Sequence, residues 1–380
     1  MKLNRRDWLT STLALTAGVT LTSSLADKLM ATPVSKAEEF YWKSIGVTAG
    51  KIKLDSNENP YGPSEKAKQA IVQILAQANR YPITEMEELK IQIGKKEGVT
   101  PDYVHVGAGS GDILCQAGAA FGLEGGSVMS AFPTFPLLMN YAETFKATWE
   151  KINLNDKLEH DYQAMASAIR NDTRLIFICN PNNPSGTFVD PQKVKTFCEE
   201  VSKKVPVYAD EAYLEFLDPS QQVSMVELVK KDMNVIVSRT FSKIHGLAGL
   251  RVGYIIAKPE LINHIATYSH DIPVSHTSIA AAKACLGDEV FMKLTRNNNE
   301  EARAVLTNYL DKKKITYGKT FTNFVFFPAP KEGKIILHKM EEKGYLIRIW
   351  DYKQMEWCRV SIGTLNEMKG FVKAFDEVVA

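Results

Sequence analysis

Six short apolar runs, most of them separated by helical segments, follow one another between residues 100 and 260. Neighbouring parallel strands need a long crossover connection, which is usually a helix. The alternation therefore predicts an α/β domain with a largely parallel sheet. The predicted strands are Tyr103–Val106, Ser127–Met129, Leu175–Cys179, Pro206–Ala209, Val235–Val237 and Gly253–Ala257.

The rest of the chain predicts a second, smaller domain. From about residue 290 a charged helix is followed by short strand-like runs and a final helix near Glu367–Val379. Ile52–Leu54 has the composition of a short strand that enters the loop Asp55–Pro63, and Ser64 opens a helix with apolar positions as far as Ala78. The 380 residues suffice for two domains. We predict a joining segment, a large domain and a small α+β domain over residues 27–64, 65–285 and 286–380.

Polar segments follow four of the apolar runs, at the strand ends where open α/β sheets bind ligands. The segment Ser238–Arg251 holds one lysine, Lys243, and the hydroxyls of Thr240 and Ser242. A lysine amine forms a Schiff base with an aldehyde, while hydroxyls and a guanidinium bind a phosphate dianion. Pyridoxal phosphate needs both kinds of group. The segment therefore predicts this cofactor, with a basic surface loop as the alternative.

This segment resembles the lysine motif of fold-type-I pyridoxal-phosphate enzymes. From about Leu54 to the C-terminus, the chain is most similar to the histidinol-phosphate aminotransferase group. The resemblance implies a homodimeric aminotransferase with a shared active site and pyridoxal 5'-phosphate as cofactor. In that group Lys243 is catalytic, while Thr240, Ser242 and Arg251 bind the phosphate. Repulsion from Arg251 and the ring cation should lower the pKa of Lys243 from about 10.4.

A glycine-rich turn, Gly107–Asp112, lies between the first apolar run and an apolar helix. Backbone N–H groups at a helix start bind phosphate, although a plain turn is the alternative. The resemblance assigns this role to Ser110 and Gly111, with the reservation that the family often has an acidic residue where Gly111 stands.

The remaining cofactor contacts also follow from the resemblance. Asp210 pairs with the protonated pyridine nitrogen, which suits a buried carboxylate that needs a cationic partner. Asn183 and Tyr213 hydrogen-bond the phenolic oxygen, and Phe135 stacks on the ring. The alternatives are an N-capping aspartate, a turn asparagine and a core phenylalanine. Tyrosine is common at the position of Phe135.

Two arginines near the C-terminus match substrate-binding positions of the family. Arg359 is expected to bind the substrate carboxylate, and Arg348 is expected to bind a substrate phosphate, unless they are surface arginines. Tyr61 is a further candidate for substrate contact. Tyr81, in an Arg-Tyr-Pro element, is expected to reach the cofactor phosphate of the neighbouring subunit, with a surface turn as the alternative.

The N-terminus predicts export. Arg5 and Arg6 lie in a run that resembles the twin-arginine motif, a weakly apolar stretch follows, and Ser24–Ala26 offers small residues for cleavage. We therefore expect a signal peptide over residues 1–26, recognition by the twin-arginine machinery and a periplasmic protein. The alternative is an attached amphipathic helix on a cytoplasmic protein.

Composition excludes few functions. The net charge of +2 gives no support for nucleic acid as a partner, and no stable membrane anchor is expected. The five cysteines are scattered without paired or metal-ligand spacing, which favours buried free thiols and no metal site.

Three activities fit these features. The first is transfer of an amino group to 2-oxoglutarate from a histidinol-phosphate-like donor or from an aromatic amino acid. Export favours the aromatic donor, because the phosphorylated intermediates of histidinol-phosphate chemistry stay in the cytoplasm. The second is a threonine-phosphate-type decarboxylase with the same cofactor. The third is a non-catalytic, exported amino-acid-binding protein.

Overall fold

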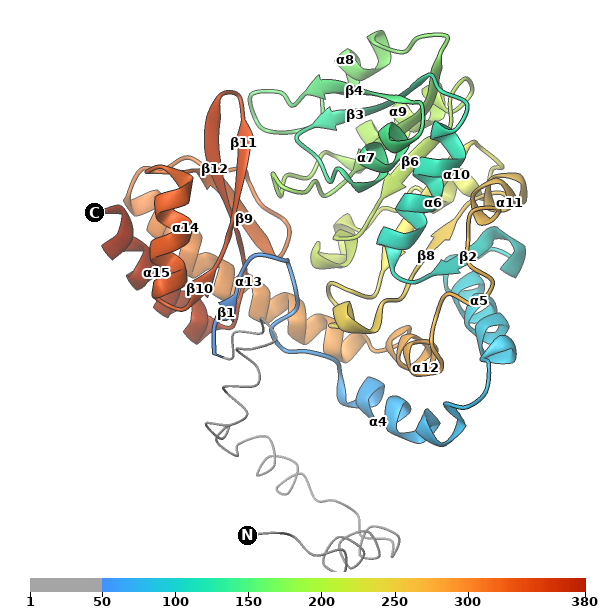
Figure 1. The fold of residues 1–380 in the computed structure, drawn as a ribbon, viewed down its shortest axis with the longest axis horizontal. Coiled ribbons are helices and arrows are strands. Elements are labelled where there is room, and N and C mark those ends of the chain that lie inside the picture. Colours follow the sequence, from blue (N-terminus) through green and yellow to red (C-terminus); the bar gives the residue numbers. More distant parts are fainter. Residues whose placement is uncertain (1–49) are drawn as a thin grey trace, which may run out of the picture. The chain divides into compact units, whose positions relative to one another are not determined.

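The computed structural model describes residues 50–380, in which Ile52–Ala380 forms one compact unit (Figure 1). The predicted signal peptide and most of the predicted joining segment lie outside the described residues. The compact unit contains a seven-stranded sheet, a three-stranded sheet and a two-stranded sheet. The predicted domain boundary at residue 285 stays a prediction.

The seven-stranded sheet has the order β2-β8-β7-β6-β5-β3-β4. Only β8 is antiparallel to its neighbours, β7 and β2, so the prediction of an α/β fold with a largely parallel sheet is confirmed. All six predicted runs lie in this sheet. The seventh strand, β4, was not predicted, because it is a partly exposed edge strand without an apolar run. The strands are β2 (Val104–Gly107), β3 (Ser127–Phe132), β4 (Thr148–Asn153), β5 (Thr173–Cys179), β6 (Val207–Asp210), β7 (Val235–Thr240) and β8 (Gly253–Ile256).

Helices cover both faces of this sheet because the buried strands are apolar on both sides. In β5, Leu175 and Phe177 pack in a core with α6, α7 and α11, whereas Ile176 and Ile178 pack in a second core on the other face. The first set of helices comprises α6 (Ser110–Gly122), α7 (Leu137–Thr144) and α11 (Pro259–Ala266). The second comprises α5 (Ile83–Glu97), α8 (Tyr162–Ser167), α9 (Pro191–Val201), α10 (Val226–Val229) and α12 (His276–Cys285).

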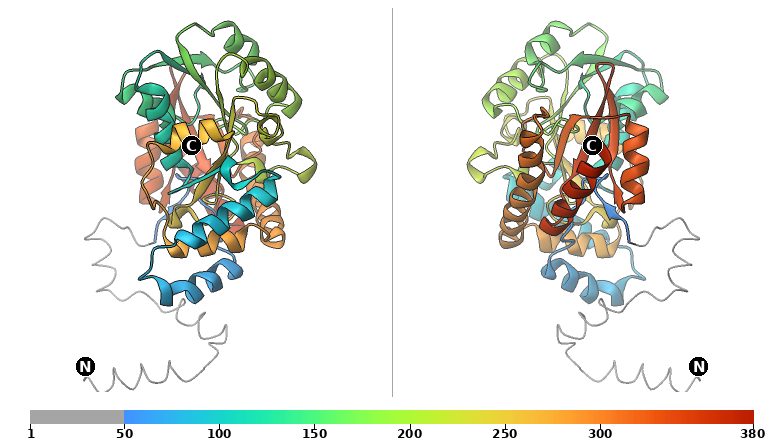
Figure 2. Two further views of the ribbon diagram at one scale, coloured as in Figure 1. Left: turned by 90° about the vertical axis from the view of Figure 1, so that its right-hand side faces the viewer. Right: turned by 90° about the vertical axis from the view of Figure 1, so that its left-hand side faces the viewer.

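The C-terminal part has a separate core around an antiparallel sheet of order β11-β12-β9. Its helices α14 and α15 face the viewer in the right-hand view of Figure 2. The charged helix and the final helix predicted from the sequence are present as α13 and α15. The elements are α13 (Glu289–Lys312), β9 (Phe324–Pro328), α14 (Gly333–Glu342), β10 (Tyr345–Leu346), β11 (Arg348–Tyr352), β12 (Met355–Ser361) and α15 (Leu365–Val379).

The N-terminal end of the compact unit joins this part through β1 (Ile52–Lys53), which pairs with β10. As predicted, Ser64 opens the next helix, α4 (Glu65–Ile74), and its hydroxyl accepts a hydrogen bond from the N–H of Ala67. The predicted extension to Ala78 is wrong, because the chain tightens into a 3₁₀ turn, η1 (Leu75–Gln77), whose side chains are exposed.

Within residues 50–380, no helix combines the length and the apolar character that a membrane crossing requires. All five cysteines are free thiols, of which four are buried. No cluster of His, Cys, Asp or Glu side chains in this part of the chain could hold a metal ion.

Candidate active site

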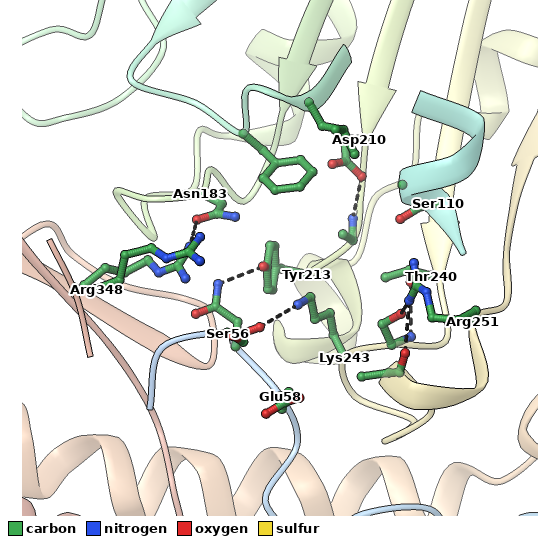
Figure 3. A pocket seen from close by; sticks show the side chains of 18 residues that line it. Ser56, Glu58, Ser110, Asn183, Asp210, Tyr213, Thr240, Lys243, Arg251 and Arg348 are labelled. Carbon is green, nitrogen blue, oxygen red and sulfur yellow. Dashed lines mark hydrogen bonds between the residues drawn. The ribbon is translucent and has the colours of Figure 1, made fainter. Parts of the chain in front are cut away.

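A cavity of about 340 Å³ lies beyond the carboxyl ends of the central strands (Figure 3). Twelve of the fourteen predicted site residues line it, although they come from segments as far apart as α6 and β12. These residues are Ser110, Gly111, Phe135, Asn183, Asp210, Tyr213, Thr240, Ser242, Lys243, Arg251, Arg348 and Arg359.

One end of the cavity gathers hydroxyls, a helix N-terminus and a guanidinium, on the right in Figure 3. Gly109 has a φ of 83° just before α6, and an added Cβ atom would collide with the guanidinium of Arg251. Nη1 of Arg251 donates to Oγ of Ser242 at 3.3 Å, and Oγ1 of Thr240 accepts from the N–H of Ser242 at 3.1 Å. This arrangement matches the needs of a phosphate dianion.

Lys243 lies between this phosphate-binding end and the opposite end of the cavity. Its amine donates to the carbonyl oxygen of Ser56 at 3.1 Å and lies 5.8 Å from the ring centroid of Tyr213. Burial lowers the pKa of this amine to about 8, with a further contribution from the positive charge of Arg359. The expected direction is therefore correct, but Arg251 is a minor cause.

Asp210 ends β6, where it is almost completely buried. Burial raises the pKa of its carboxyl group to about 6, against the effect of a hydrogen bond from Ser238. A buried carboxylate of this kind favours a cationic ligand beside it, as the protonated nitrogen of a pyridine ring would be.

The side chains around the middle of the cavity suit the other edges of that ring. The hydroxyl of Tyr213 accepts a hydrogen bond from Nδ2 of Asn57 at 3.0 Å, and burial raises the pKa of Tyr213. The amide oxygen of Asn183 accepts from Arg359 at 2.7 Å, so its NH2 group is the donor that a phenolic oxygen requires. Phe135 and Ala212 supply apolar walls for an aromatic ring.

The opposite end of the cavity carries two arginines, with Arg348 on the left in Figure 3. Arg348 and Arg359 lie directly opposite each other on β11 and β12, an unfavourable arrangement for like charges. Arg359 is buried, and its Nε has no hydrogen-bond partner within the described chain. Burial lowers the pKa of Arg359 to about 10, and the charge of Arg348 acts in the same direction. An anionic ligand would relieve both costs.

The loop Asp55–Pro63 contributes residues that were not predicted. Ser56, Asn57 and Glu58 line the cavity, and Asn57 holds a φ of 54°. The amide oxygen of Asn57 accepts from Ser361, which ties the loop to β12. The sequence marks this stretch only as a polar loop, and nothing in it indicates which distant strand the loop meets.

Two predicted residues lie elsewhere. Tyr61 lies beside Phe216 and Asn299 at a smaller cavity, and Tyr81 is 79% exposed between η1 and α5. Their predicted contacts, with substrate and with a neighbouring subunit's phosphate, stay predictions.

The residues of the cavity fit pyridoxal phosphate. An anion cradle, apolar walls, a buried carboxylate and an amine of lowered pKa occur in one space, which is the set of groups that the phosphate, ring, ring nitrogen and aldehyde require. The same space retains a second anion site at the arginine pair.

Comparison with known proteins agrees with this geometry. The family model described as "Aminotransferase class I and II" matches residues 49–375. The histidinol-phosphate aminotransferase 1 of Cupriavidus pinatubonensis is 36% identical over 352 residues, which cover 91% of this chain and 92% of that protein. The histidinol-phosphate aminotransferase 2 of Ralstonia nicotianae is 34% identical over 374 residues, covering 97% and 98%.

A solved structure shows the same fold. The histidinol-phosphate aminotransferase of Sinorhizobium meliloti, in complex with pyridoxal 5'-phosphate, superimposes with a TM-score of 0.81 at 23% identity. The match covers 96% of this chain and 98% of that one.

Proposed function

The chain belongs to the class I and II aminotransferase family and is a pyridoxal-phosphate-dependent aminotransferase, and we propose that its donor is a histidinol-phosphate-like amine or an aromatic amino acid. The proposed acceptor is 2-oxoglutarate. The arginine pair of β11 and β12 carries this proposal, because it provides two positive charges at the end of the cavity away from the cofactor phosphate.

The cofactor, when bound, supplies an aldehyde for the amine and an electron-withdrawing ring. The side chains of the cavity move the proton and orient the cofactor and the substrate. Lys243, whose pKa is lowered to about 8, is neutral often enough near that pH to accept the proton of the substrate α-carbon, and it would pass that proton to the C4′ atom of the cofactor. Asp210 would pair with the protonated ring nitrogen, and Phe135 would pack against the ring. Arg359 would orient the carboxylate of an amino-acid donor or of the oxo-acid acceptor.

The two anion sites define the substrate class. Arg359 is buried, with its unpartnered Nε, and suits a carboxylate bound at two points. Arg348 is exposed and opposite, and suits a second anionic group, such as the distal carboxylate of 2-oxoglutarate or the phosphate of a phosphorylated donor. An aromatic donor would leave Arg348 without an anion.

The other activities considered are not favoured. The relatives that are 33–36% identical over most of the chain are aminotransferases. A threonine-phosphate decarboxylase of Porphyromonas gingivalis shares the fold at 20% identity, which gives no support for its reaction here. The intact set of Lys243, Asp210 and Arg359 is not what a non-catalytic binding protein requires.

Steady-state kinetics with both donors test the proposal. We expect Arg348→Gln to lower kcat/KM for histidinol phosphate about tenfold, since a charged hydrogen bond is lost, and to leave kcat/KM for phenylalanine unchanged. Equal losses with both donors would contradict a role for Arg348 in selecting the donor. Failure of wild-type protein to use either donor would contradict the proposed donor class.

We further propose that the enzyme is a homodimer. Four apolar side chains close together in sequence along α4, η1 and α5 are exposed by 54–79% and would be covered if a partner subunit packed here; they are Val72, Leu75, Tyr81 and Ile83. Light scattering should give twice the chain mass of 42.4 kDa. A fully active species with the mass of one chain would contradict the proposal.

Export by the twin-arginine route is a separate proposal, supported by Arg5, Arg6 and the small residues Ser24–Ala26, which lie outside the described residues. This route carries folded proteins, so the cofactor would be loaded before transport into the periplasm. Cell fractionation with an Arg5→Lys, Arg6→Lys double variant tests it. Periplasmic, cofactor-loaded protein from that variant would contradict the proposal.

A further inference from the structure

Three buried side chains form a row across β5, β6 and β7, at or near the carboxyl ends of the strands. Cys179 lies opposite Asp210, and Asp210 lies opposite Ser238, in the registers of two neighbouring parallel pairs. Their exposed fractions are 1%, 3% and 0%. Of the three, Asp210 alone lines the cavity. Ser238 does not line the cavity, so its effect on a ligand there passes through its neighbours.

The two carboxylate oxygens of Asp210 have different partners. Oδ1 accepts the hydroxyl of Ser238 at 2.8 Å and the N–H of Ala212 at 3.3 Å. Oδ2 has the thiol of Cys179 at 4.0 Å, and a thiol is a weak donor. One oxygen is thus fixed by the protein, while the other keeps most of its capacity for a cationic partner.

We propose that Ser238 is a positioning residue, whose hydroxyl fixes Asp210 through Oδ1 and leaves Oδ2 to pair with the pyridine nitrogen of the cofactor. This inference rests on the cofactor of the proposed function. Its basis is the short bond between two buried groups on adjacent strands. A hydrogen bond to an ionised carboxylate stabilises the charged form, and that effect is large where water is excluded.

No charged neighbour lowers the pKa of Asp210 as much as the Ser238 hydrogen bond does. Glu211, next in the chain, raises the pKa of Asp210, whereas Lys243 lowers it by less than the Ser238 hydrogen bond does. The other titratable groups that interact with the carboxyl group all have a pKa raised by burial and stay neutral at neutral pH; they are Cys179, Tyr208 and Tyr213.

Loss of the Ser238 hydroxyl should raise the pKa of Asp210. Burial already raises the pKa of Asp210 to about 6, and the Ser238 bond opposes that rise. Without the bond the carboxyl group takes up a proton at a higher pH. Since the protonated carboxyl group no longer attracts the ring cation, affinity for the cofactor is lost earlier as pH falls.

The test is a binding titration with the full chain freed of cofactor. Pyridoxal phosphate is added across the neutral pH range, and protein fluorescence gives its dissociation constant at each pH. We expect Ser238→Ala to raise the midpoint of the affinity loss by about one pH unit. Near neutral pH the dissociation constant should rise about tenfold.

Two variants separate positioning from packing. Ser238→Thr keeps the hydroxyl and should bring the midpoint back toward the wild-type value. Ser202→Ala is the matched control, because Ser202 is 1% exposed and its hydroxyl has no partner within the described chain. This control should leave the midpoint and the dissociation constant unchanged.

Each result decides the matter. A wild-type midpoint in Ser238→Ala, or an equal shift in Ser202→Ala, would overturn the role of Ser238 while the cofactor assignment stands. Absence of saturable binding to wild-type protein would overturn the proposed function, and this inference with it.

Discussion

The two ends of the active-site cavity are built in different ways. At the phosphate end, the groups come from segments that follow strands of one sheet, and they already bond to one another, as Arg251 does to Ser242. At the substrate end, Arg348 and Arg359 come from β11 and β12, and face each other as like charges.

This contrast has a physical meaning. The phosphate end has its hydrogen-bond partners in place, so the cofactor meets a preorganised site. At the substrate end, the buried Nε atom of Arg359 has no hydrogen-bond partner within the described chain, and two positive charges face each other. Arg359 already donates to Asn183 and Asp55, but an arriving anion would also satisfy its Nε and offset the two like charges, which suits substrates that enter and leave in every cycle.

Lys243 lies between the ends, and its loss should have the largest effect. Lys243→Ala removes the proton-transferring amine, so we expect turnover to fall by at least about 10³-fold. The phosphate end is untouched, so equilibrium dialysis should still show cofactor binding at raised concentration. Turnover within about tenfold of wild type would contradict the catalytic role.

Arg359→Lys should produce the next largest effect. The charge is kept but the guanidinium fork is lost, so we expect KM for 2-oxoglutarate to rise about 10- to 100-fold. Cofactor affinity should change much less than this KM, because lysine keeps the positive charge near Lys243 and Arg359 reaches the proposed cofactor contacts only through Asn183. Arg303→Lys is a control for a partly buried arginine elsewhere, where Nη1 donates to the carbonyl oxygen of Thr322. Equal changes in both variants would point to general destabilisation.

Thr240→Val should have a smaller effect, confined to the phosphate end. The substitution preserves shape but removes a hydroxyl, so we expect the cofactor dissociation constant to rise about tenfold or less. KM at saturating cofactor should stay the same. Thr295→Val, at a buried hydroxyl without a partner within the described chain, should change neither quantity. A raised KM in the Thr240 variant would show that the two ends are coupled.

The smallest expected effect concerns pH. In cofactor-free protein, the Lys243 amine should react with an amine-directed reagent with a midpoint near pH 8, because only the neutral amine is nucleophilic. Arg359 lowers the pKa of Lys243, so Arg359→Gln should move this midpoint upward by less than about one unit. Peptide mapping gives the rate at which Lys243 is modified at each pH, and these rates give the midpoint. A downward shift would contradict the electrostatic account.

The difference between the two ends of the cavity also explains which site residues local sequence pattern predicts. Lys243, Asp210 and Asn183 follow apolar runs within six residues, and the ends of adjacent parallel strands must meet at one edge of the sheet. Glycine-rich composition predicts the start of α6 in a similar way. These features depend on local pattern and simple topology.

The substrate end depends on contacts between distant segments. The resemblance to a family identifies Arg348 and Arg359, but periodicity alone does not place them opposite each other across β11 and β12. Ser56 and Glu58 line the cavity because their loop passes beside Lys243. Lys243 lies about 190 residues further along the chain, so local sequence pattern does not predict this contact. Edge strand β4 is missed for another reason, since its partly exposed residues carry no apolar run.

The most direct test of amino transfer is the absorbance of bound cofactor during half-reactions. The band of the oxidised cofactor should disappear when histidinol phosphate, phenylalanine or glutamate acts as donor, and 2-oxoglutarate should restore it. The donor that removes the band fastest defines the substrate class. A band that no donor changes, or carbon dioxide released without need for 2-oxoglutarate, would contradict the account.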